Sequence, residues 1–86
     1  MPEKQATVKN KLGIHARPSA LLVQAAAKYD SEITLEKDGL AINGKSIMGL
    51  LELAAEVRAV ITVRVDGEDA QDALEKIGEM IETEFD

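Results

Sequence analysis

The only histidine of the chain, His15, lies three residues before Pro18. Proline is tolerated in a helix only within the first turn, so the following helix is expected to begin near His15 or Ala16. A helix N-terminus carries partial positive charge and N–H groups without intrahelical partners, and it therefore favours an anion. A phosphoryl group accepted by the imidazole would be bound there by the N–H groups of Ala16, Arg17 and Ser19. The guanidinium of Arg17 adds a planar donor fork for the same oxygens.

Other interpretations of the histidine stay open at this point. A single histidine near a helix start is often only a surface residue or a cap. Metal binding is disfavoured because the chain has no second histidine and no cysteine to complete a ligand set. A serine hydrolase triad is disfavoured because the G-x-S-x-G turn is missing. The spacing alone therefore favours phosphohistidine chemistry without excluding a histidine that takes no part in function.

A serine precedes the second apolar segment of the chain. Ser46 stands directly before Ile47–Leu53, a stretch long enough for about two helical turns. Serine is a preferred N-cap residue, so a capping role is expected whatever the function. Gly49 stands where a capping box would place glutamate, and the cap is therefore expected to be one-sided.

Periodicity predicts seven elements in the order β-α-β-β-α-β-α. Asp38-Gly39 between two alternating runs indicates a two-residue hairpin turn. Asp69 and Asp72 are expected to form an N-cap pair for the last helix. The order predicts an α+β fold, an antiparallel or mixed sheet with helices on one face. The expected elements are strand 4–9, helix 16–28, strands 33–36 and 40–42, helix 47–53, strand 60–65 and a last helix with its apolar stripe over 73–81.

Composition excludes several classes of protein. The chain has 86 residues, a net charge of −6 and no cysteine, which removes disulfide scaffolds, zinc fingers and thiol nucleophiles. One domain over residues 1–86 is expected, and no apolar run approaches a membrane span. The acidic balance argues against nucleic acid. The charge is divided, because residues 1–30 hold five Lys/Arg and two Asp/Glu, whereas residues 66–86 hold nine acids and one lysine. An anion or an acidic partner would be attracted to the first third.

Two motifs resemble one known family. Residues 13–18 (GIHARP) resemble the active-site signature of the HPr family, the histidine-containing phosphocarriers of the phosphoenolpyruvate:sugar phosphotransferase system. Residues 45–50 (KSIMGL) resemble the regulatory serine segment of that family. The similarity spans essentially the whole chain in length and element order. It implies an open-faced β-sandwich, in which three helices cover one face of a four-stranded, mainly antiparallel sheet.

The resemblance also implies a function. His15 would accept a phosphoryl group on Nδ1 from phosphorylated enzyme I and pass it to enzyme IIA proteins for sugar uptake, while Arg17 stabilises the phosphate. The protein would then be a cytoplasmic, monomeric carrier without cofactor, and not an independent enzyme. In many relatives the serine matching Ser46 is phosphorylated by a dedicated kinase, HPr kinase/phosphorylase, and a catabolite-control transcription factor is a further partner.

The short second helix has two interpretations. Ile47, Met48 and Leu51 are core residues in the simplest one. In the family this helix exposes an apolar docking patch beside the histidine, and here Arg17 and Lys45 are expected to rim it.

The chain departs from the family pattern at a few positions. Ser19 stands where alanine is common and places a hydroxyl near the expected phosphate. Residues 54–59 lack the usual glycines, so the second helix is expected to run longer than is typical. Alternatives to the sugar-system carrier are a nitrogen-branch carrier, a regulatory paralogue and a small binding module. Known regulatory paralogues lack the active histidine, which counts against that role.

Overall fold

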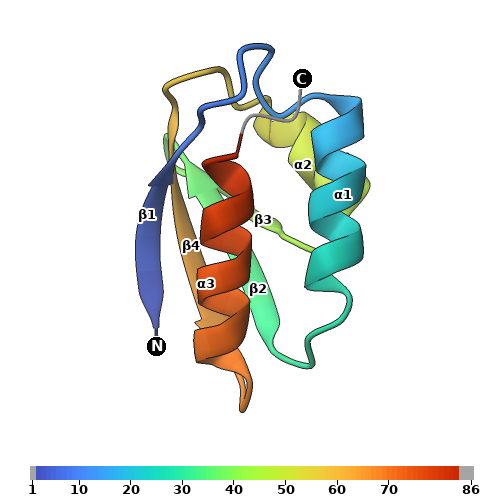
Figure 1. Ribbon diagram of the computed structural model, residues 1–86, viewed down its shortest axis with the longest axis vertical. Coiled ribbons are helices and arrows are strands. Elements are labelled where there is room, and N and C mark those ends of the chain that lie inside the picture. The colour runs from blue at the N-terminus through green and yellow to red at the C-terminus, as the bar shows by residue number, and fades with distance from the viewer. Residues whose placement is uncertain (1, 84–86) are drawn as a thin grey trace.

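Buried side chains alternate with less buried ones along β4 (Val60–Asp66), an interior strand of the sheet. In β4 the side chains of Ile61, Val63 and Val65 are buried, and the residues between them face solvent. The computed structural model describes residues 2–83 and has the predicted element order (Figure 1). The other elements are β1 (Glu3–Thr7), α1 (Ala16–Ala26), β2 (Glu32–Lys37), β3 (Leu40–Asn43), α2 (Ile47–Leu53) and α3 (Ala70–Ile81).

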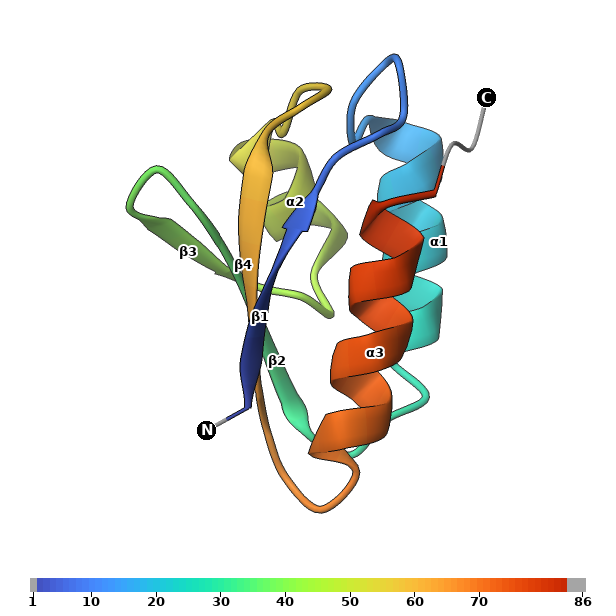
Figure 2. The same cartoon turned by 60° about the vertical axis from the view of Figure 1, so that its left-hand side comes forward.

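The four strands form one sheet in the order β1-β4-β2-β3, and every neighbouring pair is antiparallel. All three helices lie on the same face of this sheet (Figure 2). The open-faced α+β architecture predicted from the sequence is therefore confirmed. On the uncovered face, Arg64 of β4 bridges two neighbouring strands, with Nε 2.9 Å from Glu3 of β1 and a terminal nitrogen 2.5 Å from Glu36 of β2.

The predicted hairpin between β2 and β3 is confirmed. Asp38 and Gly39 have φ values of 51° and 84°, the two positive values that a type I′ turn requires. The strands then pair from Lys37 with Leu40 to Thr34 with Asn43.

The core lies between the helices and the covered face of the sheet. The stripe predicted in α3 is buried at Ala73, Leu74, Ile77 and Ile81, whereas Met80 is only partly buried against the core. Asp69 corrects one expectation, because its carboxylate makes no cap hydrogen bond to α3. It accepts instead from the N–H groups of Asp30 (2.9 Å) and Ser31 (3.0 Å) and from the Ser31 hydroxyl. The Asp69 side chain thus fastens the loop between α1 and β2.

Two element ends differ from the predicted ones by two residues. β1 ends at Thr7, but Val8 still bonds across to the later loop, donating to the Ala59 carbonyl (2.9 Å) and accepting from the Arg58 N–H (2.8 Å). α1 ends at Ala26 and finishes in a tighter turn, in which the N–H of Lys28 donates to the Ala25 carbonyl.

The expected extension of the second helix is wrong. α2 ends at Leu53, because Ala54 adopts the left-handed conformation (φ 49°, ψ 45°) while its N–H donates to the Leu50 carbonyl. Arg58 also has a positive φ of 75°. The chain therefore makes the reversal after α2 without a glycine. Across residues 2–83, none of the helices is long and apolar enough to cross a membrane.

Candidate functional site

His15 is the N-cap residue of α1. Its backbone is extended (φ −87°, ψ −164°), and its carbonyl accepts the first helical hydrogen bond, from the Ser19 N–H at 2.9 Å. The side chain is half-buried and makes no capping hydrogen bond to the helix. The helix start predicted near His15 or Ala16 is therefore confirmed, with Pro18 in the first turn.

A rigid loop places the histidine. The buried Asn10 donates from Nδ2 to the Gly13 carbonyl (2.8 Å), and the Gly13 N–H donates back to the Asn10 carbonyl (2.9 Å). Gly13 has a φ of 74°, in the region that favours glycine. The next N–H, of Ile14, donates to the Ala55 carbonyl at 2.8 Å. This last bond joins the loop before α1 to the loop after α2, so both loops meet beside His15.

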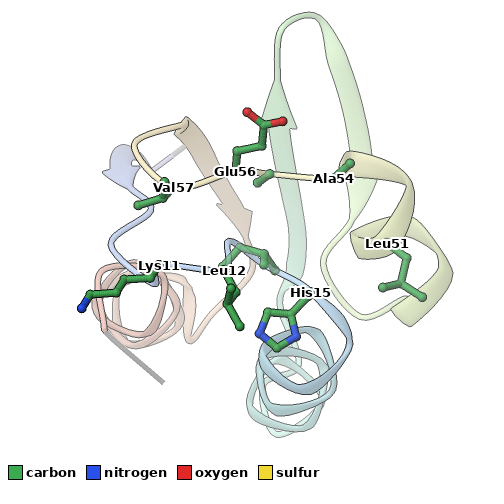
Figure 3. Close-up of a pocket in the computed structure, with 9 residues that line it drawn as sticks. Lys11, Leu12, His15, Leu51, Ala54, Glu56 and Val57 are labelled. Atoms are coloured by element: carbon green, nitrogen blue, oxygen red, sulfur yellow. The ribbon is translucent and has the colours of Figure 1, made fainter. Parts of the chain in front are cut away.

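A pocket of about 470 Å³ opens where the two loops meet (Figure 3). One wall comes from the loop before α1, which contributes Leu12 and the imidazole of His15. The opposite wall comes from the end of α2 and the residues after it. The full lining is Lys11, Leu12, Ile14, His15, Leu51, Ala54, Ala55, Glu56 and Val57. The histidine therefore borders a mostly apolar hollow.

The first turn of α1 supplies the polar groups near the imidazole. Ala16 and Arg17 are exposed in this turn, so both lie where an anion at the helix start is accessible. Ser19 does not join them. Its N–H is bonded to the His15 carbonyl, its side chain is fully buried, and its hydroxyl donates to the Ile14 carbonyl at 3.4 Å. The expectation of a third amide and an extra hydroxyl at the phosphate is therefore wrong.

Ser46 caps α2 as predicted. Its hydroxyl accepts from the Gly49 N–H at 3.1 Å, and the side chain remains half-buried. The side chain of the preceding residue, Lys45, reaches the end of α1. Its Nζ donates to the carbonyl of Tyr29 at 2.6 Å, just beyond the end of α1. Lys45 directly precedes Ser46 and the exposed side chains of α2 in the chain, and the expectation that Lys45 rims their apolar patch stays a prediction.

The apolar side chains of α2 divide between core and surface. Leu50 and Leu53 are buried, whereas Ile47, Met48 (74% exposed) and Leu51 face solvent. The simpler interpretation of these three residues as core is therefore wrong, and the exposed patch is present.

Sequence reasoning missed two further exposed residues at the pocket. Leu12 is 70% exposed, and Val57 is exposed on the opposite loop. A leucine between Lys11 and Gly13 in a polar loop was the available signal.

Comparisons with known proteins agree on one family. A family model described as "PTS HPr component phosphorylation site" matches residues 2–83. The chain is 48% identical over 85 residues to a phosphocarrier protein HPr of Xylella fastidiosa, covering 99% of this chain and 96% of the relative. It is 50% identical over 84 residues to the HPr-like protein Crh of Halalkalibacterium halodurans, covering 98% and 100%. The crystal structure of a phosphocarrier protein HPr from Bacillus anthracis superposes with a TM-score of 0.89 at 42% identity, covering 92% of this chain and 94% of that one.

Proposed function

The chain belongs to the HPr family of phosphocarrier proteins, and from that premise we propose that His15 is the residue that carries the phosphoryl group. The donor is phosphorylated enzyme I and the acceptors are enzyme IIA proteins of sugar uptake. One observation carries the proposal: His15 is the N-cap residue of α1, its side chain makes no capping hydrogen bond, and it lines the pocket between the two loops. A structural cap would instead have used that side chain on the helix N–H groups.

The proposed step is an exchange of one bond to phosphorus. The lone pair of the His15 imidazole, at Nδ1 by family resemblance, attacks the phosphorus of the donor. The new N–P bond forms as the bond from phosphorus to the donor breaks, and the donor leaves with that electron pair. Reversal of the same exchange with an acceptor returns His15 to its starting state. The protein is thus a reactant in two transfers and not an independent enzyme.

The surroundings of His15 suit the charge that this exchange creates. Three phosphoryl oxygens carry the negative charge in transfer, and catalysis depends mainly on positioning and electrostatics. The N–H groups of Ala16 and Arg17 lie at the positive end of an eleven-residue helix. The exposed guanidinium of Arg17 belongs to the same turn and neutralises the added charge. This arrangement stabilises the phosphoryl group without enclosing it, as a carrier requires.

We further propose a docking and a regulatory role for α2. Ile47, Met48 and Leu51 form an exposed apolar patch suited to transient contact with enzyme I and other partners. Phosphorylation of Ser46 by an HPr kinase/phosphorylase would add negative charge to this helix and weaken docking. A catabolite-control transcription factor is a partner of the Ser46-phosphorylated form. The protein is proposed to act as a cytoplasmic monomer.

A regulatory paralogue is the second candidate function. It is favoured by the similarity to the HPr-like protein Crh of Halalkalibacterium halodurans, whose identity to this chain is as high as that of the phosphocarriers. His15 favours the carrier, because known regulatory paralogues lack the active histidine. A nitrogen-branch carrier shares the chemistry and differs in its partners.

Incubation with phosphoenolpyruvate and enzyme I separates a carrier from a regulatory paralogue. The carrier is expected to take up phosphate that is labile in acid and stable in base, and His15→Ala should take up none. Acid-stable label, or label that persists in the variant, would contradict the proposal. Arg17→Ala should slow transfer while leaving the unfolding midpoint close to that of the wild type, because the side chain is exposed.

A further inference from the structure

Buried polar side chains are scarce among residues 2–83, and most of them lie close to the histidine in the chain. Asn10, Ser19 and Ser31 are the buried polar residues of this part of the chain, with exposed fractions of 0%, 0% and 1%. Ser31 belongs to the hydrogen bonds with Asp69 described above. Asn10 and Ser19 stand on either side of His15. A buried polar group costs free energy unless it is hydrogen-bonded, so the bonds of these two residues indicate what they are there for.

The side chains of Asn10 and Ser19 bind two consecutive carbonyl groups directly before His15. Asn10 donates from Nδ2 to the Gly13 carbonyl at 2.8 Å, and the Ser19 hydroxyl donates to the Ile14 carbonyl at 3.4 Å. Because a peptide unit is planar, each of these bonds orients a whole peptide plane. The second plane includes the N–H of His15. Two buried donors, one from each side in the chain, therefore set the backbone that leads into the histidine.

We propose that Asn10 is a positioning residue for phosphoryl transfer and that Ser19 supports it. Through the Gly13 carbonyl, Asn10 fixes the direction of the backbone that enters His15, so that the imidazole meets the phosphorus of the donor beside the positive end of α1. The proposal rests on the proposed function and deepens it. It assigns a part in the reaction to a residue that is fully buried and therefore offers a partner no contact surface.

The backbone from Asn10 to α1 is bonded at successive positions. The Gly13 N–H donates to the Asn10 carbonyl at 2.9 Å, and the Ile14 N–H donates to the Ala55 carbonyl at 2.8 Å. The His15 carbonyl then accepts the first hydrogen bond of α1, at 2.9 Å. Because these bonds follow one another along the chain, a change at Asn10 is passed on through two bonded residues to the histidine.

The direction of this backbone bears directly on where the imidazole lies. His15 is extended at the N-cap (φ −87°, ψ −164°), and the helix does not hold its ring by a capping bond. Attack on phosphorus requires the reacting atoms to be about 3–3.5 Å apart and aligned, and a displacement of about 1 Å costs about 100-fold in rate. A residue that sets the backbone of His15 therefore affects the rate of transfer in addition to stability.

The competing interpretation is that Asn10 only pairs a buried carbonyl. Gly13 is buried, so the loss of the Asn10 donor destabilises the fold under either interpretation. The two interpretations differ in kinetics. A purely structural Asn10 leaves the folded variant as active as the wild type, whereas a positioning residue lowers kcat in molecules that are folded.

Steady-state transfer from phosphorylated enzyme I tests the proposal, at a temperature where circular dichroism shows each variant to be folded. Asn10→Ala should lower kcat by about 10-fold or more while the KM for the carrier changes little. Ser19→Ala should lower kcat less, because its hydrogen bond is 3.4 Å long and that of Asn10 is 2.8 Å. If Asn10→Ala is partly unfolded, sucrose restores the compact state for the measurement, and Asn10→Ser is the milder second variant. A kcat equal to that of the wild type in the folded Asn10 variants would overturn the proposal.

Ser31→Ala is the matched control. It removes a buried donor of the same kind, the hydroxyl bonded to Asp69, at the opposite end of α1 from His15 (Figure 1). It should lower the Tm as Asn10→Ala does and leave kcat unchanged. If Ser31→Ala loses as much kcat as Asn10→Ala, the effect comes from a general loss of stability and the positioning role is wrong.

A small donor separates failure of this proposal from failure of the proposed function. Phosphoramidate phosphorylates an imidazole without docking: the N–P bond to histidine forms, and ammonia leaves. The rates of Asn10→Ala with enzyme I and with phosphoramidate should both fall, because the ring is displaced from the same helix N–H groups. A fall with enzyme I alone would mean that Asn10 acts on docking, which contradicts the positioning role. If the wild type reacts with phosphoramidate but takes no phosphate from enzyme I, the proposed function itself is wrong.

Discussion

Replacing Gly13 by alanine tests whether the close contact of Gly13 with Ala55 stabilises the loop before His15. Gly13 has a φ of 74°, where an L-residue loses about 1–2 kcal/mol. A Cβ there would also overlap the Ala55 carbonyl oxygen and lie 3.1 Å from Cα of Glu56. The hydrogen bond from Ile14 to that carbonyl must then lengthen or break, which costs about 0.5–1.5 kcal/mol. We therefore expect Gly13→Ala to lower the free energy of unfolding by about 2–4 kcal/mol.

Gly39→Ala is the matched control for this substitution. Gly39 also has a positive φ, of 84°, but a Cβ there would meet nothing within 4 Å. It should therefore cost only the conformational part, about 1–2 kcal/mol. Thermal unfolding followed by circular dichroism measures both, since each kcal/mol lowers the Tm of a chain of this size by about 4–8 °C. Equal losses for the two variants would refute the inference that Gly13 is required by its contact with Ala55.

Three further predictions concern loops and caps. The hydrogen bond from the Ser31 hydroxyl, followed by that from the Asp30 N–H, holds the pKa of Asp69 below its ordinary value. The ionised Asp69 carboxylate therefore stabilises the folded state above about pH 4, and this stabilisation is lost as the pH falls through the lowered pKa. Asp69→Asn should thus have a lower Tm than the wild type at pH 7, and the two Tm values should converge at acidic pH. A Tm difference that stays constant with pH would contradict this. Ala54→Gly should raise the free energy of unfolding by about 0.5–1 kcal/mol in urea titration, because the left-handed φ of Ala54 is relieved at the end of α2. Ser46→Ala should lower it by about 1 kcal/mol through loss of the cap on Gly49, whereas Ser46→Asp should keep a cap and still react more slowly with enzyme I.

Periodic segments made most of the fold predictable from the sequence. The β4 strand and the α3 stripe have strong alternation or helical spacing, and both lie where they were expected. The turn at Asp38 and Gly39 followed from backbone chemistry. The end of α2 did not, because Ala54 and Arg58 adopt positive φ without being glycine. Hydrogen bonds between distant segments, such as that from the Arg58 N–H to the Val8 carbonyl, impose the chain reversal after α2. The local sequence pattern of residues 54–59 does not indicate these bonds.

The candidate site was predictable where it depends on one helix turn. The placement of His15 at the N-terminus of α1 followed from Pro18 three residues later. The burial of the Ser19 hydroxyl and the reach of Lys45 to Tyr29 depend on how α1 packs against its neighbours. The pocket at Leu12 is built by two segments far apart in the sequence, so only the assembled chain reveals it.

The order of strands in the sheet also determines when the fold can be completed during synthesis. β1, the first strand to be synthesised, pairs only with β4, and α1, β2, β3 and the first part of α2 lie between the two segments that form the pocket. Closing so long a loop is entropically slow and waits for late residues. His15 is synthesised early, yet the opposite wall of its pocket comes from residues 51–57, which are synthesised much later. Completion of the sheet therefore requires nearly the whole chain, because β1 has no neighbour in it other than β4.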